Sequence, residues 1–255
     1  MTRRDKERWA PLLLLAATLL LWEGICRGFG ISEFIFPSPS RIANQLVEFR
    51  DVIAGHAWRT FWVTMVGFGL SIVVGTLLGF VIGSSRMAYA AMYPLMTGFN
   101  AIPKAAFVPI LVVWFGIGVG PAVLTAFLIS FFPITVNIAT GLATIEPELE
   151  DVLRVLGAKR WDVLIKIGLP RSMPYFYASL KVAITLAFVG TTVSEMTAAN
   201  EGIGYLLISA GSSMQMGLAF GGLVVIGAMA MIMYELFAVI EKRTTAWAHR
   251  SAGGA

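Results

Sequence analysis

The sequence predicts an all-α integral membrane protein of about six transmembrane helices. Of its 255 residues, 57% are hydrophobic and only 13% are charged, and the mean hydropathy is +0.79. An ordinary soluble domain is roughly a quarter charged because its surface faces water. A chain this poor in charge needs lipid around it. Long apolar stretches recur along it, and about 20 apolar residues in a helix cross the hydrocarbon core of a bilayer.

Six stretches are apolar and long enough to be spans: 9–26, 61–83, 88–115, 121–143, 174–198 and 217–240. The first follows a basic cluster, as a cleaved signal peptide also would, but the missing small-residue cleavage site favours an uncleaved helix. The third contains Pro94, Pro103 and Pro109. It is expected to be a broken helix whose freed backbone groups lie inside protein.

Basic residues are unevenly shared between the two sides of these spans. One side carries the N-terminal cluster, Arg86, and the Arg and Lys residues of 154–171 and 242–250, whereas the other carries only Arg27, Arg41, Arg50 and Arg59. The positive-inside rule makes the first side cytoplasmic. We therefore expect a multi-pass protein of a bacterial inner membrane, with both termini and the loop 144–173 in the cytoplasm.

The segment 27–60 lies between the first two spans. Its Pro37 and Pro39 predict a turn or extended piece. Apolar residues then recur at helical spacing over 41–59, which fits either a helix on the outer membrane surface or a simple connection. The expected division is 1–58 for the tail, first span and this periplasmic segment, 59–243 for the transmembrane core, and 244–255 for a cytoplasmic tail.

Several kinds of chemistry are not expected. Cys26 is the only cysteine, and His56 and His249 are the only histidines, far apart in the chain. No disulfide, metal site or catalytic residue is therefore predicted. A phosphate-binding G-x-x-x-x-G-K-[ST] loop is also missing from the sequence. The chain is expected to be no enzyme, to hold no cofactor and to bind no nucleic acid.

The loop 144–170 reads as two short helices joined by Gly157. In the first, Leu149, Val152, Leu153 and Leu156 form one apolar stripe at i, i+3, i+4 and i+7. Gly157 suits a left-handed C-terminal turn. The second helix is expected over 158–167, with Trp161 on its apolar face, and Leu169-Pro170 is expected to end it. The pattern alone fits either a docking element or a hairpin on lipid headgroups.

This loop resembles the signature loop of binding-protein-dependent ABC permeases, E-A-A, three residues, G, nine residues, I-x-L-P. The spacing is the same throughout, although the first three residues differ from E-A-A. Here the motif stands as Asp151-Val152-Leu153, Arg154-Val155-Leu156, Gly157 and, nine residues on, Ile167-Gly168-Leu169-Pro170.

Other segments resemble the branch of that family serving taurine, alkanesulfonates, nitrate or pyrimidine precursors. Together they cover about residues 36–240. They are Phe36-Pro37-Ser38-Pro39, Pro103-Lys104-Ala105-Ala106-Phe107-Val108-Pro109, Trp114-Phe115-Gly116-Ile117-Gly118, Ser194-Glu195-Met196 and Gly202-Ile203-Gly204-Tyr205.

The resemblance implies a type I ABC importer permease fold with a cytoplasmic coupling-helix loop. It implies that two copies of the chain form the pathway for a small solute, with an anion as one candidate class. Two separate ATP-binding subunits would bind ATP and Mg and dock on the loop. A periplasmic substrate-binding protein would deliver the solute.

Polar and small residues inside the spans are further candidates. Glu195 is either a pathway or gate residue or a structural hydrogen-bond partner, because acids in spans face the interior or water. Lys104 is either an attractant for an anionic substrate or part of a solvated helix break. Lys181 and Glu235 are expected to snorkel or to pair structurally. The helix-packing candidates, which form two overlapping G-x-x-x-G units, are Gly75, Gly79 and Gly83.

Two functions from other classes remain as alternatives. An ion-gradient-driven secondary transporter needs coupling carboxylates at mid-membrane, where only Glu195 comes close, and usually shows an inverted repeat. A membrane scaffold would not need a docking loop. Neither alternative accounts for the spacing of the loop motif.

Overall fold

The computed structural model describes residues 3–144, 152–153 and 155–245, and every regular element in these ranges is helical. Five of the described helices are long and apolar enough to cross a membrane, and a bent pair of shorter helices counts as a sixth crossing. The prediction of an all-α protein with about six spans is confirmed.

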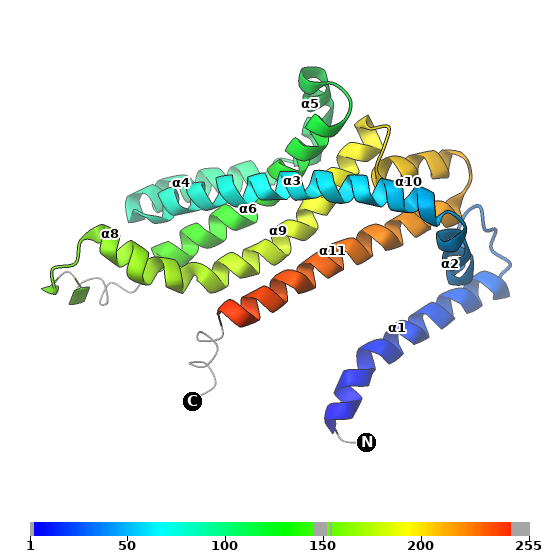
Figure 1. Cartoon of the computed structure of the whole chain (residues 1–255), viewed down its shortest axis with the longest axis horizontal. Helices are drawn as coiled ribbons and strands as arrows, with labels where there is room; N and C mark the ends of the chain where they lie inside the picture. The colour runs from blue at the N-terminus through cyan, green and yellow to red at the C-terminus, as the bar shows by residue number, and fades with distance from the viewer. Residues whose placement is uncertain (1–2, 145–151, 154, 246–255) are drawn as a thin grey trace.

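Four long helices form the body of the molecule and run side by side in Figure 1. α3 packs on α6, α6 on α9, and α9 on α11. Their shared core includes Phe68, Ile134, Ile184 and Phe188. The four are α3 (Arg50–Gly83), α6 (Val119–Ala143), α9 (Leu169–Ala198) and α11 (Met216–Thr244).

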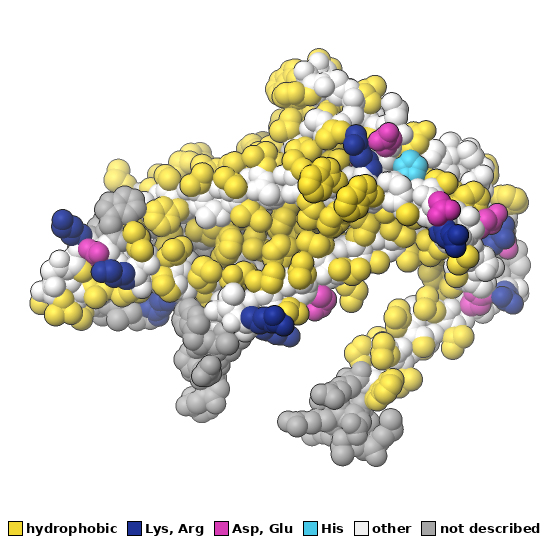
Figure 2. All heavy atoms as spheres, viewed as in Figure 1, with side chains coloured by type: hydrophobic (Ala, Val, Ile, Leu, Met, Phe, Trp, Pro, Cys, Tyr) yellow, Lys and Arg dark blue, Asp and Glu magenta, His cyan; other side chains and the backbone are white. Residues whose placement is uncertain are grey.

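The surface of this body is suited to lipid. Figure 2 shows hydrophobic side chains covering the flanks of the long helices, whereas charged side chains gather near their ends. Exposed apolar residues such as Trp62, Val73 and Leu77 of α3 make up these flanks. A water-soluble monomer rarely exposes apolar patches of this extent.

The first span stands apart from the body. α1 (Arg3–Gly28) extends away from it and is joined to it through α2 (Pro39–Glu48) in Figure 1. Glu23 fixes the joint, because its carboxylate accepts hydrogen bonds from the Ser40 N–H at 3.0 Å and the Ser40 hydroxyl at 2.7 Å. Trp22 also meets Phe220 of α11, with ring centroids 6.2 Å apart.

The structure differs from both alternatives for residues 41–59, a surface helix and a simple connection. α2 ends at Glu48, Phe49 leaves the helical conformation, and α3 already begins at Arg50. With 34 residues, α3 is about 51 Å long at 1.5 Å per residue, well beyond a hydrocarbon core of about 30 Å. Its polar first turns extend past the core, which is why they resembled a separate amphipathic helix.

The third span is broken, as predicted. α4 (Arg86–Ala101) is followed by a short 3₁₀ helix η1 (Lys104–Phe107) and by α5 (Val108–Phe115), with a bend of 73°. Pro103 restricts its predecessor, and Ile102 is accordingly extended. Figure 1 shows α5 standing away from the row of long helices.

The segment after Gly157 leads directly into the fifth span. α8 (Arg160–Val163) continues through the π-helix η2 (Leu164–Gly168) into α9. The predicted helix end at Leu169-Pro170 is therefore wrong, and so is the start of the span at residue 174. Pro170 lies in the first turn of α9, where a missing N–H costs little.

One short helix was not expected from the sequence. The short helix α10 (Ile203–Ser212) lies between α9 and α11 and packs on both. It shares one end of the molecule with α2 (Figure 1), called here the α10 end, whereas α8 marks the opposite, α8 end.

Small residues on α3 bring it into contact with α6. A Cβ atom added to Gly75, Gly79 or Gly83 would lie 2.8 to 3.0 Å from the Cβ of the facing α6 residue, which is too close. The ridge also includes Gly67, which the sequence analysis did not single out. These glycines therefore pack within the subunit, where close backbone approach replaces the missing hydrophobic drive between helices in lipid.

An ion pair joins α9 to α11. The Lys181 ammonium lies 2.6 Å from the Glu241 carboxylate, and both side chains are mostly buried. The Lys181 ammonium also lies 5.8 Å from the centre of the Tyr234 ring. The expectation that Lys181 pairs structurally is confirmed, whereas Glu235 is exposed.

Candidate functional site

The most ordered polar cluster lies at the α10 end and surrounds the start of α10. Three successive backbone amides donate hydrogen bonds to side chains from other helices. The Gly202 N–H donates to His56 Nδ1 at 3.0 Å, the Ile203 N–H to Thr60 Oγ1 at 2.8 Å, and the Gly204 N–H to Glu195 Oε2 at 3.0 Å. These three side chains form the α10 cap.

The α10 cap solves a general problem of helices. The first N–H groups of a helix have no partner within it and must find one elsewhere. His56 and Thr60 are four residues apart, so they project from the same face of α3. Glu195 reaches the third amide from α9. The start of α10 is thereby tied to two spanning helices.

Glu195 is the buried centre of the cap, with an exposed fraction of 3%. Its carboxylate accepts a hydrogen bond from the Thr60 hydroxyl, at 2.8 Å to one oxygen and 3.0 Å to the other. A second hydrogen bond between α3 and α9 lies one turn along α3, where the Thr64 hydroxyl donates to the Thr191 hydroxyl at 2.9 Å. The Thr60–Glu195 and Thr64–Thr191 hydrogen bonds thus join α3 to α9.

Two glycines make room for this carboxylate. Gly202 has φ +103°, a conformation that favours glycine, and a Cβ there would overlap the Glu195 carboxyl group. A Cβ on Gly204 would overlap the Thr192 carbonyl oxygen and would lie 2.6 Å from the Glu195 Cβ. The Gly-Ile-Gly pattern at 202–204 is thus required by close packing on α9.

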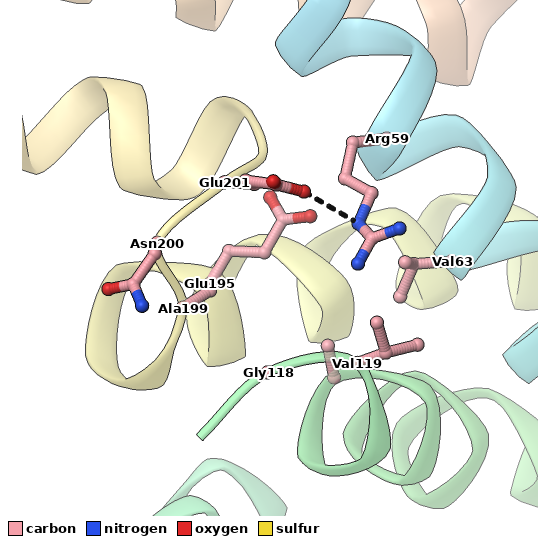
Figure 3. Close-up of a pocket in the computed structure, with 9 residues that line it drawn as sticks. Arg59, Val63, Gly118, Val119, Glu195, Ala199, Asn200 and Glu201 are labelled. Atoms are coloured by element: carbon pink, nitrogen blue, oxygen red, sulfur yellow. Dashed lines mark ion pairs between the residues drawn. The ribbon is translucent and has the colours of Figure 1, made fainter.

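A pocket of about 190 Å³ adjoins the cap between α3, α9 and the start of α6. In Figure 3, Arg59 points toward the turn before α10 and pairs with Glu201, while Glu195 rises from α9 beneath them. The Arg59 Nε–Glu201 Oε2 distance is 3.2 Å, and both side chains are partly exposed. Pockets for drug-sized ligands are about 300–1,000 Å³, so this one is small.

The second candidate, Lys104, lies at the break of the third span. It is 9% exposed, and its ammonium donates to the Asn100 carbonyl oxygen at 3.1 Å and to the Asn100 side-chain oxygen at 2.7 Å. The centres of the Phe99 and Phe132 rings are each 5.8 Å away. Among the described residues no carboxylate forms an ion pair with it. The structure does not bring Lys104 and Glu195 together, because each lies at its own helix junction.

The predicted coupling loop lies at the α8 end and is described only in part. Leu149, Asp151 and Arg154 lie outside the described residues, and Trp161 lies within α8. Val152, Leu156 and Leu169 are exposed, whereas Leu153 and Ile167 are half-buried.

Gly157 has the conformation expected of it. Its φ is +83°, and a Cβ there would meet no atom within 4 Å. The Ala158 N–H closes the turn by donating to the Leu153 carbonyl oxygen at 3.0 Å. Backbone geometry alone, and not lack of space, makes this a glycine position.

The Asp162 side chain caps the first turn of α8, the helix that follows. Its carboxylate accepts a hydrogen bond from the Lys159 N–H at 3.1 Å and lies 3.3 Å from the Lys166 ammonium. The Lys159 N–H, and then Lys166, hold the pKa of Asp162 below its ordinary value. An acid three residues after the N-cap, bonded back to it, is one half of a capping box.

Sequence reasoning missed most of the α10 cap. His56, Thr60 and Arg59 were placed in a surface segment or at the edge of a span, and α10 was not predicted. The available signal was two polar residues four apart at the start of α3, together with the glycines at 202 and 204. Nothing in the sequence linked these segments, which are more than 140 positions apart.

Comparison with known proteins gives the chain its family. Residues 71–245 match the model of the family described as "Binding-protein-dependent transport system inner membrane component". That range includes the whole loop from Thr144 to Pro170 and the Glu195 side of the α10 cap.

Relatives over most of the chain are transport permeases. The chain is 31% identical to the formylaminopyrimidine transport permease protein of Halalkalibacterium halodurans, over 80% of this chain and 81% of that one. It is 29% identical to a probable ABC transporter permease of Haemophilus influenzae, over 88% and 91%. It is 24% identical to the taurine transport system permease of Escherichia coli, over 96% and 94%.

A solved structure shares the fold. The permease in an inward-facing form of the MetNI methionine ABC transporter superposes with a TM-score of 0.67, at 17% identity, over 77% of this chain and 98% of that one. The expected type I permease fold is confirmed. This multi-pass membrane protein is an ABC transporter permease and belongs to the family of binding-protein-dependent transport system inner membrane components.

Proposed function

We propose that two copies of this chain form the pathway of an ABC importer in a bacterial inner membrane. Two separate ATP-binding subunits, which supply ATP and Mg, dock at the α8 end. A periplasmic binding protein delivers a small solute at the α10 end. The chain itself catalyses no reaction.

One observation carries this proposal. The family match includes the loop 144–170, and Gly157 at the centre of the loop has the left-handed turn that the sequence predicted. The exposed apolar residues around Gly157, including Val155 at 88% and Leu156 at 76% exposure, suit burial against a partner. A scaffold protein would have no use for such a loop.

The relatives of this chain differ in the solute that they serve. The relatives' names specify chemically different solutes, a formylaminopyrimidine and taurine among them. Lys104 remains a candidate attractant for an anion, and Glu195 remains a candidate pathway residue because it borders the pocket at the α10 end. Delivery by the binding protein would make that protein the main determinant of specificity.

Purified protein tests the energy source. The chain, co-expressed with an ATP-binding subunit and reconstituted with its binding protein, should take up solute only when ATP is present on the α8 side. Native mass spectrometry should show two copies of each membrane-associated subunit. Uptake that continues without ATP and stops when an ionophore collapses the ion gradient would instead identify a secondary transporter.

Reporter fusions test the orientation. A reporter active only in the cytoplasm should work after Arg160, and one active only in the periplasm should work after Asp51. Arg160 lies outside the candidate spans, and Asp51 lies in the first turn of α3. A periplasmic signal after Arg160 would place the loop on the wrong side for an ATP-binding subunit.

A further inference from the structure

We propose that His56 is a pH-sensitive latch, which holds the start of α10 against α3 while its imidazole is neutral and releases it when protonated. This regulation goes beyond the proposed transport function and does not depend on it. It rests on one hydrogen bond whose direction admits only one protonation state of the ring.

The Gly202 N–H points at His56 Nδ1, with 3.0 Å between the two nitrogens. A backbone amide can only donate, so Nδ1 must accept and therefore carries no proton. A protonated imidazole has N–H donors at both nitrogens and no acceptor. Protonation would place one donor against another, and the hydrogen bond would be lost.

The location of His56 allows it to sense the surrounding solution. It lies in the second turn of α3, a helix longer than a hydrocarbon core is thick. Its side chain is half-buried rather than sealed, and its ring centre lies 6.0 Å from that of Tyr205. Imidazole is the side chain that most often serves as a charge switch between pH 5 and pH 8 in proteins.

Of the other two members of the α10 cap, only Glu195 can take up a proton. Thr60 does not titrate, and the Glu195 carboxylate is buried among donors. Other charged or titratable groups on the elements packed against this end of α3 belong to the turn and α10, to α2 and to α3 itself. They are Glu201 and Tyr205, Arg41 and Glu48, and Arg50, Asp51 and Arg59.

Release would be local. The Ile203 and Gly204 amides keep their partners, and α10 still packs on α9 and α11. The Arg59–Glu201 pair also still bridges α3 and the turn. We therefore expect the turn at Gly202 to open more often at low pH while the helices stay folded.

Hydrogen exchange on the full chain in lipid nanodiscs tests the latch. Exchange is measured between pH 5 and pH 8 and corrected for the intrinsic pH dependence of amide exchange. Protection of the Gly202 amide should fall about tenfold between pH 7.5 and pH 5.5, because a hydrogen bond to a partly buried donor is lost. The start of α2, which Glu23 holds without a histidine, should show no such step.

Two variants identify the responsible group. His56→Gln carries a neutral amide at every pH, so its Gly202 protection should be independent of pH, whatever its level. His249→Gln, at the only other histidine, should keep the wild-type step. A flat wild-type profile would overturn the proposal, and so would an equal step in His56→Gln, which would assign the effect to a carboxylate.

Discussion

A single carboxylate organises the α10 end of this permease. Glu195 is nearly inaccessible, yet it accepts hydrogen bonds from a hydroxyl of α3 and from the backbone of α10. Placing an acid inside a span is costly unless such partners are present. The same device recurs at Glu23 of α1, whose carboxylate accepts a hydrogen bond from an amide in the first turn of α2. Both short helices at this end therefore begin on a glutamate supplied by a long one.

Removing the Glu195 carboxylate should be destabilising. Glu195→Ala leaves the Gly204 N–H without a partner and deprives the Thr60 hydroxyl of its acceptor, so we expect a loss of roughly 1–3 kcal/mol of unfolding free energy. Thermal unfolding of purified protein in detergent is the measurement.

Glu201→Ala is the matched control, because it removes an acid six residues away that is 66% exposed and paired only with Arg59. Exposed pairs of this kind contribute about 0–1 kcal/mol. If both variants unfolded at the same temperature, the α10 cap would have no special role in stability.

At the scale of helices, the sequence was most informative where the pattern is local. The apolar runs predicted the spans, the prolines predicted the broken third span, and the glycines at 75, 79 and 83 predicted close packing. Helix ends were predicted less well. The start of α3 looked amphipathic because its first turns leave the hydrocarbon core, and Pro170 did not end a helix because it occupies a first turn.

The contacts of the α10 cap were not predictable in the same way. They join α3 to the distant segment that contains α9 and α10. In addition, the short α10 has no periodicity long enough to stand out from the neighbouring apolar segments. In the sequence, only Gly202 and Gly204 indicated that a side chain packs closely on this segment. Their spacing does not identify that side chain as Glu195.

The glycine ridge makes a testable prediction about the packing of α3 on α6. Gly79→Leu would drive a side chain into Ile138 and the Thr135 carbonyl oxygen, each 2.8 Å from the position of a Cβ. Overpacking of this kind costs about 1–3 kcal/mol, so the yield of folded protein in the membrane should fall. Leu78→Phe, at a neighbouring residue that is 41% exposed, should have little effect. Equal yields would show that this face of α3 does not pack on α6.

The Lys181–Glu241 ion pair between α9 and α11 leads to a further testable prediction. Lys181→Met leaves the Glu241 carboxylate mostly buried without its cation, and Glu241→Leu does the converse. Each should lower stability by roughly 3 kcal/mol, whereas the double variant should lose less than either, because no unpaired charge remains. Melting temperatures of the four proteins complete the cycle. Additive losses would mean that the two residues do not interact.

At the scale of the whole molecule, the two ends have different characters. The α10 end is fixed by side chains from α1, α3 and α9, whereas the α8 end presents a turn with exposed apolar residues. Four long helices connect the ends. This arrangement suits a protein that receives solute at one end and a mechanical signal from an ATP-binding subunit at the other.

Uptake by a Gly157→Val variant tests that account most directly. A β-branched residue is a severe outlier at φ +83°, so the loop should present its apolar stripe at the wrong angle, while the spans still insert. Membrane abundance, co-purification of the ATP-binding subunit and solute uptake are measured together. Gly157→Asn is the control, because asparagine tolerates a left-handed turn. The account predicts normal abundance in both variants and loss of uptake only in Gly157→Val; normal uptake in Gly157→Val would contradict it.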